Sequence, residues 1–265
     1  MLDALAVTAK YSHKDGSNTR GLHFNEMRAS PPNAKCAVLL VRDPRDASVS
    51  HYHHATRRSC LYSGSISEFL RDPRYGIEKC ARFNLIWGET ARVRDDMIIV
   101  SYEAMRDDAV NCLHAILNFF GCPRPDQQVR GVVQRNRFNV MQALETAGEI
   151  DWRYRDRLGA KNPNDPQSLK CRKGNVGGYR DELSLEDIAY CDSILKELGY
   201  FDRLGITPHD AAVTWQAAAR PEPAVYAVGK PGDLVAMDNL SAHKGCRVRD
   251  AIESAGTRLL CQQPS

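Results

Sequence analysis

Residues 36–50 read CAVLLVRDPRDASVS and contain the signals that decide the fold. Cys36–Val41 is a continuous apolar run, as expected for a strand that is covered on both faces in a parallel sheet. A charged turn follows, and Pro44 suits a turn or the first position of a helix because its φ angle is already helical. The stretch therefore predicts a strand, a turn and a helix, which is the repeating unit of an α/β protein.

The same alternation of short apolar runs and longer helical patterns continues to about residue 204. Residues 97–100, which are also apolar and β-branched, predict a second central strand. Helices are expected at 77–93, 107–120 and 184–198. The last of these has Ser184 as its N-cap and Gly199 as its stop. We therefore predict a three-layer α/β sandwich with a central parallel sheet flanked by helices.

The composition is that of an ordinary globular protein, with 43% hydrophobic and 26% charged residues in a chain of 265. The longest apolar run is far shorter than the roughly 20 residues that span a bilayer, and no basic region follows Met1. We therefore expect neither a signal peptide nor a membrane anchor. The nine cysteines include no Cys-x-x-Cys pair, so a reducing cytoplasm fits best.

The character of the chain changes after residue 204, where an alanine-rich stretch and two prolines predict a linker at 206–224. Residues 225–265 predict a small βαβ-like tail, with a strand at 234–237, a helix at 247–255 and a strand at 258–261. Such a tail is too short to form a stable core alone. We therefore expect one α/β domain at 1–205, followed by the linker and the tail.

The turn after the first strand is the strongest candidate for a binding site, because open α/β sheets bind ligands at the carboxyl ends of their strands. Arg42 can donate two parallel hydrogen bonds, the helix start offers free N–H groups, and Ser50 adds a hydroxyl. A phosphate is the natural partner of such a set. The alternative is that Arg45 forms only surface ion pairs with Asp43 or Asp46.

Two other segments contain candidate site residues. Arg172 and Lys173 precede Gly174 in the stretch RKGNVGGY, where glycines let backbone N–H groups approach an anion, although a plain turn is the alternative. Tyr102 follows the second strand and is placed to contact a base or a ribose, although it could be an ordinary strand-end tyrosine. His51 and His54 would share a helix face, but no third ligand has a suitable spacing, so no metal is expected.

In order and context, three motifs together resemble the cytosolic-type sulfotransferase family. They are RDPRD with Ser50, SYE at 101–103 and RKGNVG at 172–177, and the resemblance extends over about residues 36–204. It implies transfer of a sulfuryl group from 3'-phosphoadenosine-5'-phosphosulfate (PAPS) to a hydroxyl or amine of a small-molecule or glycan acceptor. It also implies that Arg42 and Ser50 hold the 3'-phosphate, that Arg172, Lys173 and Gly174 close on it, and that Tyr102 lies near the adenine.

The resemblance also implies a catalytic histidine after an early strand, for which His13 is the candidate and His23 the nearest competitor. A neutral imidazole can accept the acceptor's proton, although His13 could also be a solvated loop residue. Members of the family carry a lysine-containing loop that holds the 5'-phosphosulfate, and nothing before His13 resembles it. We therefore expect a chain that lacks the family's first strand and has weak or no activity.

The tail has a resemblance of its own. Residues 231–260 resemble the segment around the second catalytic aspartate of insertion-sequence transposases with an RNase H-like fold, with Asp238 at the matching position. Such enzymes need three carboxylates to hold two metal ions, and the other two have no counterpart here. We therefore expect no nuclease activity.

Three functions remain open after this comparison of motifs. A PAPS-dependent sulfotransferase is preferred, and a non-catalytic protein that binds PAPS or its product 3'-phosphoadenosine-5'-phosphate (PAP) is the alternative. A nucleic-acid-binding transposase remnant is disfavoured, because a net charge of +3 and the lack of a basic stripe give little attraction for a phosphate backbone. Neither a nucleic acid nor a membrane is expected as a partner.

Overall fold

The computed structural model describes residues 10–11, 24–26, 36–150, 159–162, 164–206 and 234–238. The strands are β1 (Lys10–Tyr11), β2 (Cys36–Val41), β3 (Met97–Ser101) and β4 (Leu234–Asp238). The helices are α1 (Pro44–His53), α2 (Ile66–Arg71), α3 (Ile77–Arg92), α4 (Tyr102–Asp107), α5 (Ala109–Phe119), α6 (Asp126–Arg135), α7 (Phe138–Ala147), α9 (Leu185–Glu197) and α10 (Tyr200–Leu204). A π-helical turn, His54–Arg58, continues α1, and short 3-10 helices span Phe24–Glu26, Pro166–Ser168 and Gly178–Asp181.

The strands form one parallel sheet with the order β1-β4-β2-β3. Val38 pairs with Ile98 and Val41 with Ser101, so β2 and β3 run side by side over their whole length. The predicted parallel α/β architecture and both of its central strands are therefore confirmed.

The strand predicted at 234–237 is present as β4, which lies between β1 and β2. Ala37 is opposite Val235 and Leu40 is opposite Asp238. These residues of the tail therefore belong to the same sheet as β2. The helix predicted at 247–255, the strand predicted at 258–261 and almost all of the predicted linker lie outside the described residues.

The core between the sheet and α3 follows from the alternation of side chains along β2. Ala37, Leu39 and Val41 point to one face and are buried against α3. From α3, Phe83, Trp87 and Ala91 complete this cluster. The helix predicted at 77–93 is α3, which ends one residue earlier, at Arg92.

The helix predicted at 107–120 begins later than expected. Asp108 has a φ of −139° and accepts a hydrogen bond from the Asn111 N–H at 3.0 Å, so it caps α5 and separates it from α4. The helix predicted at 184–198 is present as α9. Ser184 caps its start, and Gly199, with a left-handed φ of 58°, follows its end as predicted.

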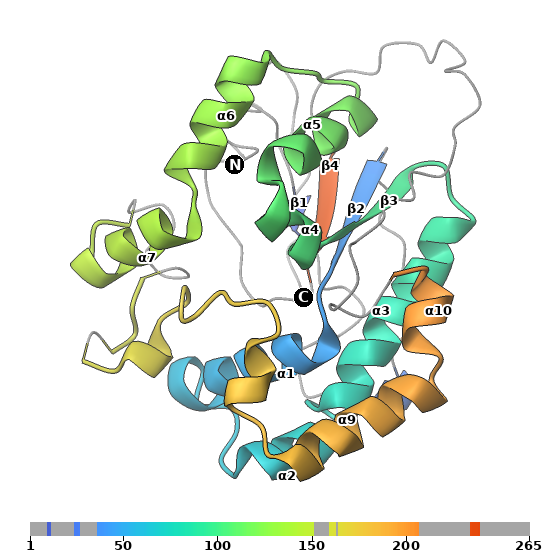
Figure 1. The fold of residues 1–265 in the computed structure, drawn as a ribbon, viewed down its shortest axis with the longest axis vertical. Coiled ribbons are helices and arrows are strands. Elements are labelled where there is room, and N and C mark those ends of the chain that lie inside the picture. The colour runs from blue at the N-terminus through green and yellow to red at the C-terminus, as the bar shows by residue number, and fades with distance from the viewer. Residues whose placement is uncertain are drawn as a thin grey trace, which may run out of the picture.

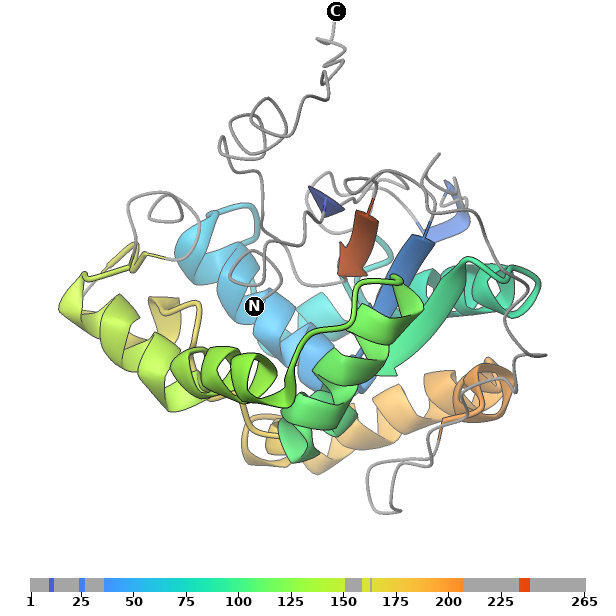
Figure 2. The ribbon, with the colours of Figure 1, turned by 90° about the horizontal axis from the view of Figure 1, so that it is seen from above.

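Figure 1 shows α1 leaving the lower end of β2, with α7 and the yellow segment around residues 164–181 beside it. The view from above in Figure 2 also places α4 and α5 in front of the strands of Figure 1. None of the helices in the described ranges is both long enough and apolar enough to cross a membrane. The carboxyl end of β2 leads into α1, and a hydrogen bond from Gly177 to Asp46 holds the loop of residues 170–178, which we call the RKG loop, against α1.

Candidate anion-binding site

The start of α1 is held by a buried ion pair. Asp43 caps the helix by accepting from the Arg45 N–H at 2.9 Å, and its carboxylate also binds the Arg45 guanidinium at 2.7 Å. The same guanidinium binds Asp192 at 2.7 Å and lies 4.4 Å from the centre of the Tyr179 ring. Burial disfavours the charge, but the hydrogen bond to Asp43 and the nearby charges of Asp43 and Asp192 together outweigh it and raise the pKa of Arg45. The pair is therefore buried rather than at the surface, and it ties α1 to α9.

Arg42 is held from several directions but keeps one donor free. Its Nη2 donates to the Asn175 carbonyl at 2.9 Å, lies 3.6 Å from the Asp46 carboxylate, and belongs to a guanidinium 4.4 Å from the centre of the Tyr102 ring. Its Nε is buried and has no hydrogen-bond partner among the described residues. A fixed guanidinium with an unused N–H is suited to an anionic ligand.

Asp46 fastens the RKG loop to α1. Its carboxylate accepts from the Gly177 N–H at 2.7 Å and from the Tyr179 N–H at 2.9 Å. Burial raises the pKa of Asp46, although the charge of Arg42 and these two N–H groups act in the opposite direction. The expectation that the glycine-rich segment offers its N–H groups to a ligand is therefore wrong at residues 177 and 179, because Asp46 occupies both.

Gly174 is required by its backbone angle and by a close approach. Its φ is 62°, in the left-handed region, and a Cβ atom there would lie 2.3 Å from the Phe138 ring. The Tyr102 hydroxyl donates to the Gly174 carbonyl at 3.1 Å. Burial raises the pKa of Tyr102, so its hydroxyl keeps the proton that this bond uses. The two predicted residues are thus direct neighbours.

Arg172 and Lys173 share one carboxylate. Glu182 accepts from Arg172 Nη1 at 2.5 Å and Lys173 Nζ at 3.0 Å, and its second oxygen lies 2.6 Å from His53 Nε2. Burial opposes ionisation of Glu182, but the hydrogen bonds from these three side chains prevail and lower its pKa to about 2. Glu182 is therefore ionised at neutral pH.

The main chain before Arg172 is supported by α7. The buried carboxylate of Glu145 accepts from the N–H groups of Lys170 at 2.6 Å and Cys171 at 2.7 Å, and Arg58 lies 3.3 Å from it. Gln142 donates to the carbonyls of residues 171 and 172. Arg58 comes from the π-helical turn, a feature often found at functional sites. These contacts fix where the following cations point.

One cavity of about 230 Å³ is lined by all six residues predicted to bind the cofactor. They are Arg42, Ser50, Tyr102, Arg172, Lys173 and Gly174. The other lining residues are Asp46, Val49, His51, His53, His54, Arg58, Phe138, Leu169, Lys170, Cys171, Asn175, Gly178 and Glu182. Arg42 comes from the turn between β2 and α1, and the others come from α1, its π-helical continuation, α4, α7 and the RKG loop with its flanks. The fold thus brings together positions far apart in sequence.

The cavity is electropositive. Five cationic side chains line it, against the two carboxylates of Asp46 and Glu182; the cations are Arg42, Arg58, Lys170, Arg172 and Lys173. Burial lowers the pKa of His54 to about 3, and the charges of Lys170 and Arg58 add to this effect. His54 is therefore neutral at neutral pH, and the positive charge of the cavity comes from these five side chains.

Sequence reasoning did not find Asp46, Glu145 or Glu182 as members of the site. A single carboxylate carries no motif, and each of these three has a partner that is distant in sequence and meets it only in the folded chain: Asp46 with Gly177, Glu145 with Lys170, and Glu182 with His53. The predicted catalytic His13 and its competitor His23 lie outside the described residues. Among the described residues no cluster of three or more potential metal ligands occurs.

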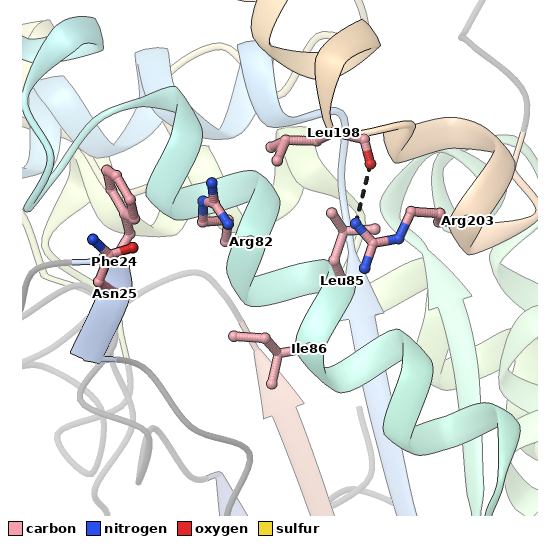
Figure 3. Close-up of a pocket in the computed structure, with 7 residues that line it drawn as sticks. All are labelled: Phe24, Asn25, Arg82, Leu85, Ile86, Leu198 and Arg203. Atoms are coloured by element: carbon pink, nitrogen blue, oxygen red, sulfur yellow. Dashed lines mark hydrogen bonds between the residues drawn. The ribbon is translucent and has the colours of Figure 1, made fainter.

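A second cavity of about 250 Å³ lies away from these residues, along α3 and the turn between α9 and α10 (Figure 3). It is lined by Phe24, Asn25, Arg82, Leu85, Ile86, Leu198 and Arg203. Arg203 donates to the Leu198 carbonyl at 3.2 Å, as the dashed line in Figure 3 shows. None of the predicted site residues lines it, so the cavity at α1 is the better candidate.

The fold and the site together define an α/β protein with an anion site at the carboxyl end of a central strand. The family model described as a sulfotransferase domain matches residues 22–201, more than half of the chain, and the chain belongs to this family. Sulfotransferase 6B1 of Danio rerio is 26% identical over 167 residues, which is 62% of this chain and 52% of the relative. Luciferin sulfotransferase of Photinus pyralis is 22% identical over 168 residues, covering 60% and 43%.

Solved structures agree on the fold. The crystal structure of retinol dehydratase in complex with androsterone and inactive cofactor PAP has a TM-score of 0.51 and 23% identity, and the match covers 66% of this chain and 50% of that one. The complex of retinol dehydratase with retinol and PAP gives a TM-score of 0.50 at the same identity, covering 66% and 51%. The chain thus spans about half the length of the relatives it matches.

Proposed function

We propose that the chain binds PAPS, or its product PAP, in the cavity at α1 and transfers the sulfuryl group to a hydroxyl or amine of an acceptor. The observation that carries the proposal is the convergence of the six candidate residues on one electropositive cavity. Membership of the sulfotransferase family and the PAP named in the matching structures support the choice of ligand.

The residues present fit a phosphate. The free Nε of Arg42 is a buried donor that needs an acceptor, and a phosphate oxygen would supply one. Arg172 and Lys173 add two more cations, and the Ser50 hydroxyl lines the same cavity. The Tyr102 hydroxyl is already used and Arg42 lies over one face of its ring, so the other face is the one assigned to a base or a ribose.

Each residue then has one task in the proposed reaction. Arg42, Ser50, Arg172 and Lys173 bind the 3'-phosphate, Gly174 lets the loop pass close to it, and Tyr102 orients the nucleotide. PAPS, when bound, supplies the sulfuryl group. By the family resemblance, His13 accepts the proton of the attacking hydroxyl or amine. Holding donor and acceptor in line accounts for much of the rate enhancement in group transfer of this kind.

A thermal-shift titration with PAP tests the binding step, with AMP as the ligand that lacks the 3'-phosphate. Because a ligand stabilises the folded chain by RT ln(1 + [L]/Kd), PAP is expected to raise the melting temperature more than AMP does. Arg42→Ala should abolish the difference between the two nucleotides. Arg92→Ala, at the exposed end of α3, is the matched control and should preserve it. No shift with millimolar PAP in a cooperatively melting chain would refute the proposal.

A second candidate is a protein that binds PAP without turnover. The observation in its favour is that the six candidate residues lining the cavity are all assigned to nucleotide binding, and none of them to the transfer step. PAP binding without detectable transfer from labelled PAPS to a panel of acceptors would select this function.

The proposed transposase origin of residues 225–263 remains a prediction. The family match ends at residue 201, so it does not include this segment. A cytoplasmic location and a three-layer sandwich are likewise proposed from the sequence and the family.

A further inference from the structure

Glu182 binds one nitrogen of Arg172 and the ammonium of Lys173, two cations that the proposed function assigns to a phosphate. One carboxylate accepts from both Arg172 and Lys173, at 2.5 Å and 3.0 Å, and also binds His53 at 2.6 Å. Its side chain is 13% exposed and lines the cavity beside Arg42. The carboxylate therefore lies inside the anion site rather than at its edge.

A carboxylate and a phosphate bind the same kinds of protein group. Both accept charge-assisted hydrogen bonds from guanidinium and ammonium groups, and both carry negative charge at neutral pH. Two anions that share one set of donors repel each other, and the donors bound to one are lost to the other. With its pKa lowered to about 2, Glu182 does not escape this repulsion by protonation at neutral pH.

We infer that Glu182 is an internal competitor of the 3'-phosphate, which holds Arg172 and Lys173 in place until the nucleotide displaces it. The inference rests on the proposed function and adds a determinant of affinity and specificity to it. A ligand without a 3'-phosphate has no group that could replace the carboxylate, so Glu182 stays bound to Arg172 and Lys173. The contact thus weakens binding of PAP while maintaining the cations of the empty site.

The test is the affinity of Glu182→Gln for PAP and for AMP, measured by isothermal titration calorimetry. Glutamine keeps the size and one carbonyl acceptor but removes the charge. We expect PAP to bind about tenfold more tightly than to the wild type and AMP to bind equally well. Asp181→Asn removes the same charge from the neighbouring residue, which is exposed and does not line the cavity, and should change neither affinity.

Weaker or unchanged PAP binding by a cooperatively melting Glu182→Gln would overturn the inference, because Glu182 would then only position the cations. If neither the wild type nor Glu182→Gln binds PAP, the proposed cofactor site is wrong, and the inference about Glu182 is refuted together with it. A measurement on the wild type needs no variant. The carbon-13 carboxyl resonance of Glu182 should change its chemical shift when PAP is added and keep it when AMP is added. An unchanged chemical shift in the presence of bound PAP would also refute displacement of Glu182.

Discussion

Replacing Glu145 by glutamine tests whether α7 holds the RKG loop as the structure indicates. The carboxylate is 1% exposed and accepts from two backbone N–H groups, at 2.6 and 2.7 Å, as well as from Arg58 at 3.3 Å. Burial lowers the pKa of Arg58, and Glu145 counteracts that shift. Glutamine would leave this guanidinium without its buried counter-charge and would turn an amide donor toward one of the N–H groups.

The magnitude follows from these contacts. A hydrogen bond to a charged group is worth about 1.5–3 kcal/mol, and removing one partner of a buried ion pair costs about 3–5 kcal/mol. Because the two costs overlap at one carboxylate, we expect Glu145→Gln to lower the free energy of unfolding by about 3–5 kcal/mol. Domains of this kind have only about 5–15 kcal/mol in total.

Urea denaturation followed by circular dichroism measures the change. Glu149→Gln is the matched control, since Glu149 is exposed just beyond the end of the same helix, and it should alter the free energy by less than about 0.5 kcal/mol. Amide hydrogen exchange at residues 170 and 171 should accelerate in the Glu145 variant. A loss below about 1 kcal/mol with unchanged exchange would refute the reasoning.

Three further predictions concern the loop, its counter-ion and the sheet. Gly174→Ala should weaken PAP binding strongly, because the new methyl group would collide with the Phe138 ring, and Phe138→Ala in the same chain should recover part of the affinity by calorimetry. Glu182 has a pKa of about 2 in the folded chain, below its unfolded value of about 4.5, so it stabilises the fold above that value and the stabilisation is lost as the pH falls toward 2. Urea titrations should therefore show the difference between the wild type and Glu182→Gln, up to about 3 kcal/mol at pH 6, shrinking toward pH 2; a constant difference would contradict this. Ala236→Pro should destabilise the chain by about 1–3 kcal/mol, because proline removes an N–H from a strand between two neighbours, and an unchanged melting temperature would show that β4 does not pair with β2.

The local elements were predictable because their signals are local. Cys36–Val41 is apolar over six residues, and it is a strand from its first to its last predicted residue. Ser184 and Gly199 act as cap and stop because cap geometry depends on a few neighbouring residues. The division between α4 and α5 was missed, although Asp108 is a residue type that caps helices, because the apolar spacing around it continues without a break.

The candidate site was predictable only in part. Arg42, Tyr102 and Gly174 belong to motifs with a fixed context, and they line one cavity. Glu182 and Asp46 have no such context, and each acquires its role from partners that the fold brings to it, such as His53 for Glu182 and Gly177 for Asp46. These two contacts join residues 129 and 131 positions apart, and no pattern in the neighbouring residues predicts them.

The class of the fold, the central strands and the motifs that converge on an anion could be predicted from the residues alone, because hydrophobic periodicity, capping and turn chemistry act over a few residues. Which donors stay free and which strands β4 pairs with depend on the folded chain. Asp46 takes the loop N–H groups, Glu182 takes Arg172 and Lys173, and Arg42 keeps its Nε. Pairing of strands and of buried charges depends on distance in space, and the folded chain alone sets that distance.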